Sequence, residues 1–247
     1  MTNAPAALWF RLVPAYAVGY FLSYALRSVN AVIAPELMRE LNMSAAGLGL
    51  LTSTYFLAFG LFQLPLGLLL DRFGPRRVEA ALLLLAAAGC ALFGWGESTQ
   101  TLVLARALIG LGVSACLMAS FKAFSQWFRP EQLPSLTATI MVAGGLGALS
   151  ASAPVEAALP LLGWRGLFFV CAALLVVCAA YLMTTPDKPV QAQRESITQQ
   201  LQTLRQIYTD RRFWRFAPQG CLAVGGFMAI QGLWAVPWLM QVNGLSR

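Results

Sequence analysis

The sequence contains no histidine and very little charge. Of its 247 residues, 58% are hydrophobic and only 11% are Asp, Glu, Lys or Arg. A soluble domain carries about 25% charged residues, so this chain has too few to cover a water-facing surface. Without histidine the commonest proton shuttle is missing, and any proton coupling must use a carboxylate. These shortages exclude a soluble globular domain.

The chain also lacks the residue groupings of metal centres and common active sites. Its five cysteines all lie in apolar stretches and form no CxxC pair: Cys90, Cys116, Cys171, Cys178 and Cys221. Cysteines in such surroundings behave as small hydrophobic residues. There is no Ser/His or Cys/His pair and no glycine loop that would cradle a phosphate. We therefore expect no enzyme activity, no metal and no cofactor.

What the sequence does have is long apolar segments, each about as long as or longer than the roughly 20 residues that a membrane-spanning helix needs. They predict seven spans, over about residues 8–34, 45–70, 78–95, 101–128, 133–162, 166–183 and 213–242. Short polar turns separate them, for example at residues 96–99 and 163–165. We predict an all-α membrane protein.

The basic residues between the spans predict the orientation, because short cytoplasmic loops are enriched in Lys and Arg. With the N-terminus inside, 12 of the 17 basic residues lie on the cytoplasmic side and 3 lie outside. The net charge of +7 then reflects orientation in the bilayer and not a nucleic-acid partner. We expect a multi-pass plasma-membrane protein, in bacteria an inner-membrane protein, with a cytoplasmic N-terminus.

A polar stretch over residues 186–212 predicts a cytoplasmic linker. Ile197, Leu201, Leu204 and Tyr208 recur in it at spacings of three and four. That spacing is typical of an amphipathic helix lying on a membrane surface. The alternative is a mobile linker in which the spacing is accidental.

The most specific motif stands between the second and third predicted spans. It reads Gly67-Leu-Leu-Leu-Asp71-Arg72-Phe-Gly74-Pro-Arg76-Arg77. A glycine at the first position lets helices approach closely, a carboxylate at a helix end accepts from a basic group, and the second glycine permits a turn. The segment resembles the signature loop of the major facilitator superfamily of secondary transporters. The resemblance implies that these residues form a conformational latch between the two halves of a transporter.

Two weaker matches support the resemblance. Arg106-Ala-Leu-Ile-Gly110 is similar to the Arg-x-x-x-Gly pattern of the family's fourth helix. The fifth span is rich in glycine but lacks the family's central Gly-Pro pair, which puts antiport in doubt. Its small residues Gly144, Ala148 and Ser152 more simply predict close helix packing.

The resemblance implies a six-helix bundle built from two inverted three-helix repeats. We assign residues 1–185 to this bundle, 186–212 to the linker, and 213–247 to the first helix of an incomplete C-terminal bundle. Members of the family usually have twelve spans. The resemblance therefore implies a further C-terminal half, missing from this chain, as a partner.

Three ionisable residues are the clear cases of a charge deep within a predicted span, where charge is costly and indicates function. Arg27, Arg106 and Glu156 lie at similar distances from the outer ends of their spans. One interpretation places the arginines in a substrate site, with Glu156 as a proton site. The alternative is a structural ion pair in which Glu156 is the counter-ion. One glutamate cannot neutralise two arginines, so a positive charge would remain for a ligand.

Polar and aromatic residues around Arg27 predict a helix face that lines a water-filled cavity. Tyr20, Tyr24 and Asn30 share this face. The segment is similar to the first helix of organophosphate and related anion transporters, in which an arginine binds the anion. Gln231 and Trp234 of the seventh span are further candidates to line the cavity.

We therefore expect a transporter that moves a small solute, specifically a small organic or inorganic anion, by alternating access in symport with an ion. The alternatives are an efflux transporter for drugs or metabolites, and a sensor of the same fold that binds without transport.

Overall fold

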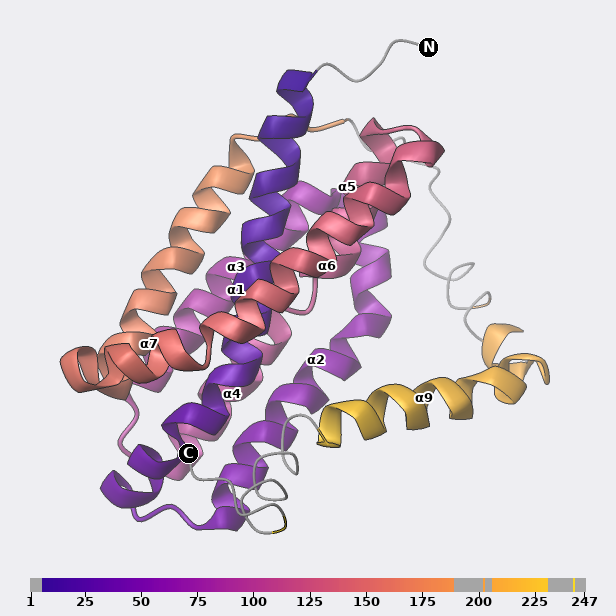
Figure 1. Ribbon diagram of the computed structural model, residues 1–247. Helices are drawn as coiled ribbons and strands as arrows, with labels where there is room; N and C mark the ends of the chain where they lie inside the picture. The colour runs from indigo at the N-terminus through magenta and orange to yellow at the C-terminus, as the bar shows by residue number, and fades with distance from the viewer. Residues whose placement is uncertain (1–5, 189–201, 203–205, 231–241, 243–247) are drawn as a thin grey trace. The chain divides into compact units, whose positions relative to one another are not determined.

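The computed structural model describes residues 6–188, 202, 206–230 and 242 (Figure 1). They belong to two compact units, Met1–Gln191 and Ala192–Arg247, which we describe separately. The described residues are almost entirely helical, and none is in a strand. The predicted all-α architecture is confirmed.

The first unit consists of seven α-helices and one turn of 3-10 helix. These are α1 (Ala6–Glu40), α2 (Ala45–Phe73), α3 (Pro75–Trp95), α4 (Thr99–Gly112), α5 (Cys116–Trp127), η1 (Pro130–Gln132), α6 (Leu133–Ser150) and α7 (Ala153–Met183). Among the described residues, six segments are long and apolar enough to cross a membrane, and α4 and α5 together form one of them. The second unit contains α9 (Phe213–Ala229), the beginning of the seventh predicted span. The rest of that span and most of the predicted amphipathic helix lie outside the described residues.

Local chemistry sets several helix ends. The side chains of Ser44 and Ser98 accept hydrogen bonds from the amides of Gly47 and Thr101, at 3.1 and 3.2 Å, and so begin α2 and α4. Between α2 and α3, Gly74 has φ 81°, a left-handed conformation that favours glycine. The predicted turn at Gly74 is confirmed.

Two predicted boundaries are wrong, and one span has an interruption that was not predicted. The first helix does not stop at Pro35 but continues to Glu40, because Ile33 and Leu37 on either side of the proline are fully buried and hold the helix in place. The fourth span is interrupted between Gly112 and Cys116. The side-chain amide of Gln63 on α2 donates a hydrogen bond to the Ser114 carbonyl in this interruption, at 3.1 Å. It thereby satisfies a backbone carbonyl at the break in the helix.

The second wrong boundary concerns the fifth span, which ends at Ser150 and not at residue 162. A new helical segment starts at Ala153, and Gly163 interrupts α7 with φ 64°. The turn predicted at residues 163–165 is therefore present, although the helix before it is a separate piece.

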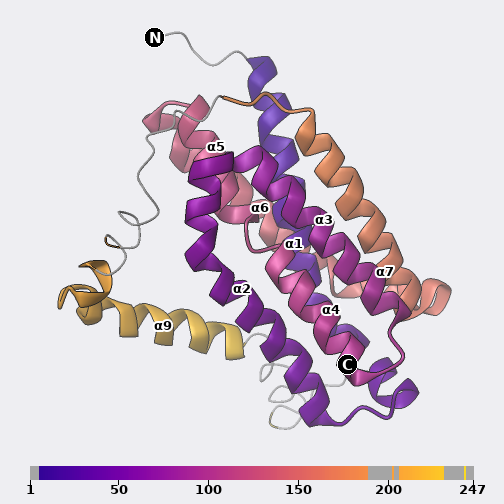
Figure 2. The ribbon, with the colours of Figure 1, turned by 180° about the vertical axis from the view of Figure 1, so that it is seen from behind.

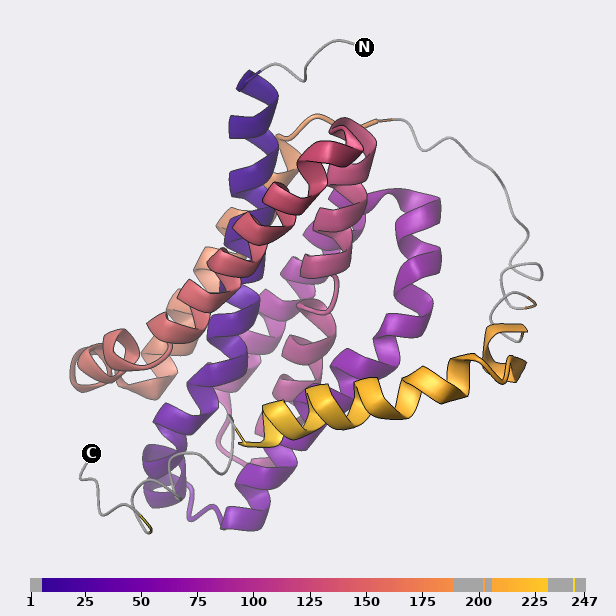
Figure 3. The same ribbon diagram turned by 45° about the vertical axis from the view of Figure 1, so that its right-hand side comes forward.

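In the first unit α3 packs against both α4 and α7, and α1 packs against α6 and α7 (Figure 1). Seen from behind, α2 lies along α4 (Figure 2). A third view shows α6 running alongside α1 (Figure 3). Large apolar side chains such as Leu57, Leu61 and Val142 remain exposed on this unit. An apolar outer face is what a helical bundle in lipid requires.

Glycines allow the closest helix contacts. A Cβ at Gly147 would collide with the Phe21 carbonyl on α1, and one at Gly110 would collide with the Tyr55 backbone on α2. The face of α6 that approaches α1 therefore contains Gly144 and Gly147, both buried. The predicted face of Gly144, Ala148 and Ser152 is wrong at its last member, since Ser152 is exposed beyond the end of α6.

Candidate functional site

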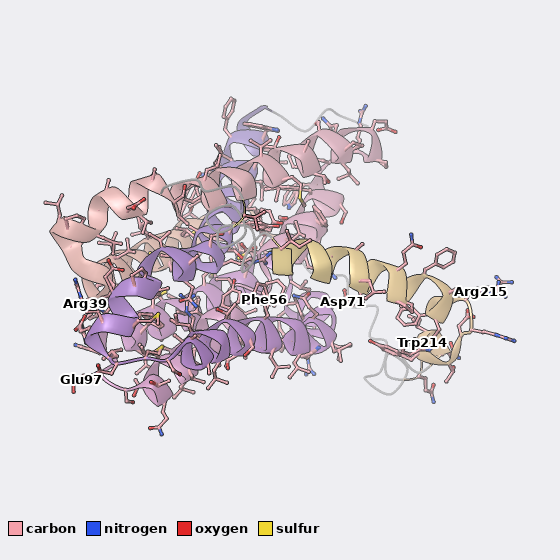
Figure 4. All side chains as sticks on the ribbon, turned by 60° about the horizontal axis from the view of Figure 1, so that its bottom comes forward. Arg39, Phe56, Asp71, Glu97, Trp214 and Arg215 are labelled. Carbon is pink, nitrogen blue, oxygen red and sulfur yellow. The ribbon has the colours of Figure 1, made fainter. Side chains whose placement is uncertain are left out.

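Arg27 lies on α1 within a group of aromatic rings. Its guanidinium carbon is 4.5 Å from the ring centroid of Tyr24, 5.2 Å from that of Phe59 and 5.8 Å from that of Phe56. Both phenylalanines belong to α2, and Figure 4 labels Phe56 on that helix. The rings orient the side chain through cation–π contacts. Arg27 is only partly buried, so its planar donor fork is suited to an anionic group of a ligand.

Tyr20 continues this cluster from α1. Its ring meets that of Tyr24 edge-on, with centroids 4.9 Å apart. Gly144 on α6 makes room for the pair, because a Cβ there would come within 2.6 Å of the Tyr20 ring. Three helices, α1, α2 and α6, therefore shape the surroundings of Arg27. Tyr20 itself is buried, with its hydroxyl 4.0 Å from the Met141 sulfur.

Arg106 on α4 has very different surroundings and is only 1% exposed. It donates hydrogen bonds to the Leu26 carbonyl at 2.9 Å and to the side-chain oxygen of Asn30. Its guanidinium carbon lies 5.0 Å from the Phe93 ring centroid and 5.4 Å from that of Phe168. Arg106 thus ties α4 to α1, α3 and α7. This geometry favours the structural interpretation of Arg106 over a place in a substrate site.

Asn30 belongs to the same buried network. While its oxygen accepts from Arg106, its amide nitrogen donates to the Thr52 hydroxyl on α2 at 3.3 Å. The predicted set of Tyr20, Tyr24, Arg27 and Asn30 is therefore divided. Arg27 and Tyr24 belong to the aromatic cluster, whereas Asn30 connects α1 to α2 and α4.

Glu156 does not pair with these arginines. It lies exposed in the first turn of α7, and the ion pairs of the described residues do not include it. The alternative in which Glu156 neutralises Arg106 is wrong in this structure, since neutral oxygens of Leu26 and Asn30 take that place. Gln231 and Trp234 lie outside the described residues.

The signature loop connects the helices at one end of the bundle. Asp71 at the end of α2 forms an ion pair with Lys122 on α5. Arg76 donates to the carbonyls of Met183 and Thr185, at 3.3 and 2.7 Å, and lies 3.2 Å from an Asp187 oxygen. The loop therefore joins α2 and α3 to α5 and to the segment after α7. Figure 4 shows Asp71 well away from the labelled Arg39 and Glu97.

Other residues of the loop contribute less. Arg77 is 3.9 Å from Asp187 and Arg72 lies over the Phe73 ring at 5.4 Å; both arginines are exposed. Gly67 is exposed too, and nothing described lies within 4 Å of a Cβ built on it. The close helix approach expected at Gly67 is not present within this unit.

The candidates chosen from the sequence did not include one buried carboxyl group, that of Glu79. Glu79 on α3 is 0% exposed and belongs to a candidate span, although it stands only two residues after the basic signature loop. The predicted third span, residues 78–95, includes Glu79 as its second residue, but the glutamate was not counted among the intramembrane charges. Counting α3 from Pro75 shows that Glu79 begins the second turn of a helix.

Comparisons with known proteins agree with this architecture. The family model of the Major Facilitator Superfamily matches residues 16–246. The hexuronate transporter of Escherichia coli strain K12 is 26% identical over 96% of this chain and 59% of its own length. The galacturonate transporter of Dickeya chrysanthemi is 24% identical over 85% of this chain and 65% of its own. The chain thus spans about 59–65% of these relatives.

Among solved structures, an inward-facing bacterial homolog of the human lysosomal transporter Spinster is similar in fold. It aligns with a TM-score of 0.71 and 18% identity, over 99% of this chain and 58% of its own.

Proposed function

Since this chain belongs to the Major Facilitator Superfamily, we propose that it is a secondary transporter of small organic acids, with Arg27 binding the carboxylate. The observation that carries the proposal is the position of Arg27, partly exposed and set among Tyr24, Phe56 and Phe59. A guanidinium fork binds carboxylates through two parallel hydrogen bonds. The names of the two relatives, both transporters of sugar acids, support this choice of solute.

The transport mechanism that we propose is alternating access coupled to an ion gradient, in the plasma membrane and with the N-terminus in the cytoplasm. Two halves would move around a central site, as in transporters built from repeats. The ion pairs of Asp71 and Arg76 lie at the end that we assign to the cytoplasm, where they would hold the helices together in one state.

Ligand pairs that differ in one group provide the test. Binding of glucuronate and galacturonate to the purified full-length gene product is compared with binding of glucose and galactose, by thermal shift and by uptake into proteoliposomes. The acids should bind and the neutral sugars should not. Arg27→Ala should weaken acid binding about tenfold or more, because a hydrogen bond to a charged group contributes roughly 1.5–3 kcal/mol. Arg39→Ala, at an exposed position of α1, is the matched control and should bind as the wild type does.

Equal binding of neutral sugars, or unchanged acid binding by Arg27→Ala, would contradict the carboxylate site. Binding without uptake would indicate a sensor of the same fold.

A further inference from the structure

Glu79 is a carboxyl group enclosed by four helices. Its side chain is 0% exposed, and among the described residues no N–H or O–H group donates a hydrogen bond to either oxygen; the one donor beside the carboxyl is the weak thiol of Cys116. It lies four residues into α3, roughly 6 Å from the start of that helix. The carboxyl is therefore inside the bundle, yet close to the end that carries the signature loop.

A space in α1 accommodates this carboxyl. Gly19 faces it, and a Cβ at Gly19 would be 2.6 Å from a Glu79 oxygen. Any larger residue at position 19 would displace the glutamate. The carboxyl group of Glu79 therefore fits because Gly19, 60 positions earlier in the sequence, has no side chain.

No positive charge from the surrounding helices neutralises Glu79. Its titratable neighbours are Tyr16 on α1, Cys116 on α5 and Cys178 on α7, all of them neutral groups at ordinary pH. The charged groups at the same end are engaged elsewhere. Arg76 binds Asp187 and two carbonyls, and Lys122 binds Asp71.

An ionised carboxylate without partners in such a place is so costly that the group takes up a proton instead. We propose that Glu79 is a proton-binding site, neutral in this arrangement of the helices and able to release its proton when α1 moves away and water reaches it. The proton site itself does not depend on which solute is carried. Its coupling to transport rests on the proposed function.

Infrared spectroscopy tests the protonation directly. The chain has seven glutamates, and labelling them with ¹³C separates their carbonyl absorption from that of the aspartates. In nanodiscs at about pH 8, exposed glutamates are ionised. The wild-type protein should retain the band of one protonated glutamic acid, and Glu79→Gln should lose it. Absence of this band from the wild-type spectrum would overturn the proposal.

Assignment of the band does not depend on one variant. If Glu79→Gln does not fold, Glu36→Gln and Glu156→Gln replace it, because the band should persist in both. Loss of the band in either of them would assign the proton to that residue and overturn the proposal for Glu79.

The pH dependence of stability provides the second readout. A folded state that holds one more proton than the unfolded state loses stability as pH rises. Between about pH 6 and about pH 9, the midpoint of thermal unfolding should therefore fall more in the wild type than in Glu79→Gln. Glu97→Gln, at an exposed turn, should behave as the wild type does. Parallel curves for the wild type and Glu79→Gln would overturn the proposal.

Both measurements work without a solute. A failed test of sugar-acid binding would leave the proton site standing, and a missing infrared band would leave the carboxylate site standing.

Discussion

At the scale of single residues, the two intramembrane arginines have opposite surroundings. Arg106 is enclosed and donates to a carbonyl and an amide oxygen, whereas Arg27 is partly exposed among aromatic rings. Both arginines can be recognised as candidate functional residues from the sequence, because each lies within a predicted span. Their partners could not be predicted, because Leu26 and Asn30 of α1 are brought within reach of the Arg106 side chain only by the folding of the bundle.

We predict that Arg106→Ala and Arg27→Ala affect different properties. Arg106→Ala leaves the side-chain oxygen of Asn30 without its donor and opens a cavity, so stability should fall by about 2–5 kcal/mol. Arg27→Ala removes a partly exposed side chain and should change stability by less than about 1 kcal/mol. Unfolding of both purified variants in detergent measures the difference. Equal destabilisation would show that Arg27 too is a structural residue.

Glu79 shows the limit of the sequence at this scale. It is the second residue of the predicted third span, directly after the arginines of the signature loop, so the sequence places it at the end of a span and not in the interior. Its burial depends on Gly19, which no local pattern connects to position 79. Intramembrane charges near a helix end need the three-dimensional packing to be recognised.

At the scale of helices, the apolar segments were sufficient to predict the first six spans. The interruption after Gly112 could not be predicted, since the residues around it are mostly apolar. The end of α6 at Ser150 does have a sequence signal, because Ser152 and Pro154 follow it directly. Distant groups support such breaks, as the Gln63 amide does at Ser114. The four-residue spacing of small residues predicted close packing of α6. The two glycines that contact α1, Gly144 and Gly147, are instead three residues apart.

Two glycines on α6 provide a matched test of that packing. A methyl group at Gly147 meets the Phe21 backbone on α1, whereas nothing lies within 4 Å of one at Gly145. Gly147→Ala should therefore destabilise the bundle by roughly 1–3 kcal/mol through overpacking. Gly145→Ala should be neutral or stabilise it by up to about 1 kcal/mol, because alanine favours the helix. Thermal unfolding of the two variants checks this, and a loss of stability in Gly145→Ala alone would contradict the assigned face.

At the scale of the whole bundle, the signature loop connects helices that are distant in sequence. Arg76 contacts Met183, Thr185 and Asp187, more than 100 positions later. The sequence motif predicted the loop and its place. It did not predict these partners, because one sequence does not show which distant residues the fold brings to Arg76.

Weakening these contacts should loosen the end of α7. Cys178 is 2% exposed and lies about a turn and a half before Met183, so its alkylation reports opening of this end. Asp187→Asn removes one partner of Arg76 and should speed alkylation roughly two- to fivefold. Arg76→Gln removes all three contacts and should speed it more, while Arg77→Gln should have little effect. Mass spectrometry of the labelled peptides gives the rates, with exposed Cys221 as the internal control. Equal rates in Arg76→Gln and wild type would show that these contacts do not hold α7.

The last prediction concerns the orientation of the bundle in the membrane. One end carries Arg76, Lys122 and Asp187, joined by the contacts of the signature loop, and the other end carries Glu40 bound to Arg165. Basic residues in short loops remain on the cytoplasmic side, and the first end has most of them. Alkaline phosphatase fused after Ser98 should therefore be active, because the proposed orientation places this turn outside and the enzyme folds only outside the cytoplasm. Fusions after Arg129 or Asp187 should be inactive. Activity in the reverse pattern would invert the orientation, and Glu79 would then exchange its proton with the external side.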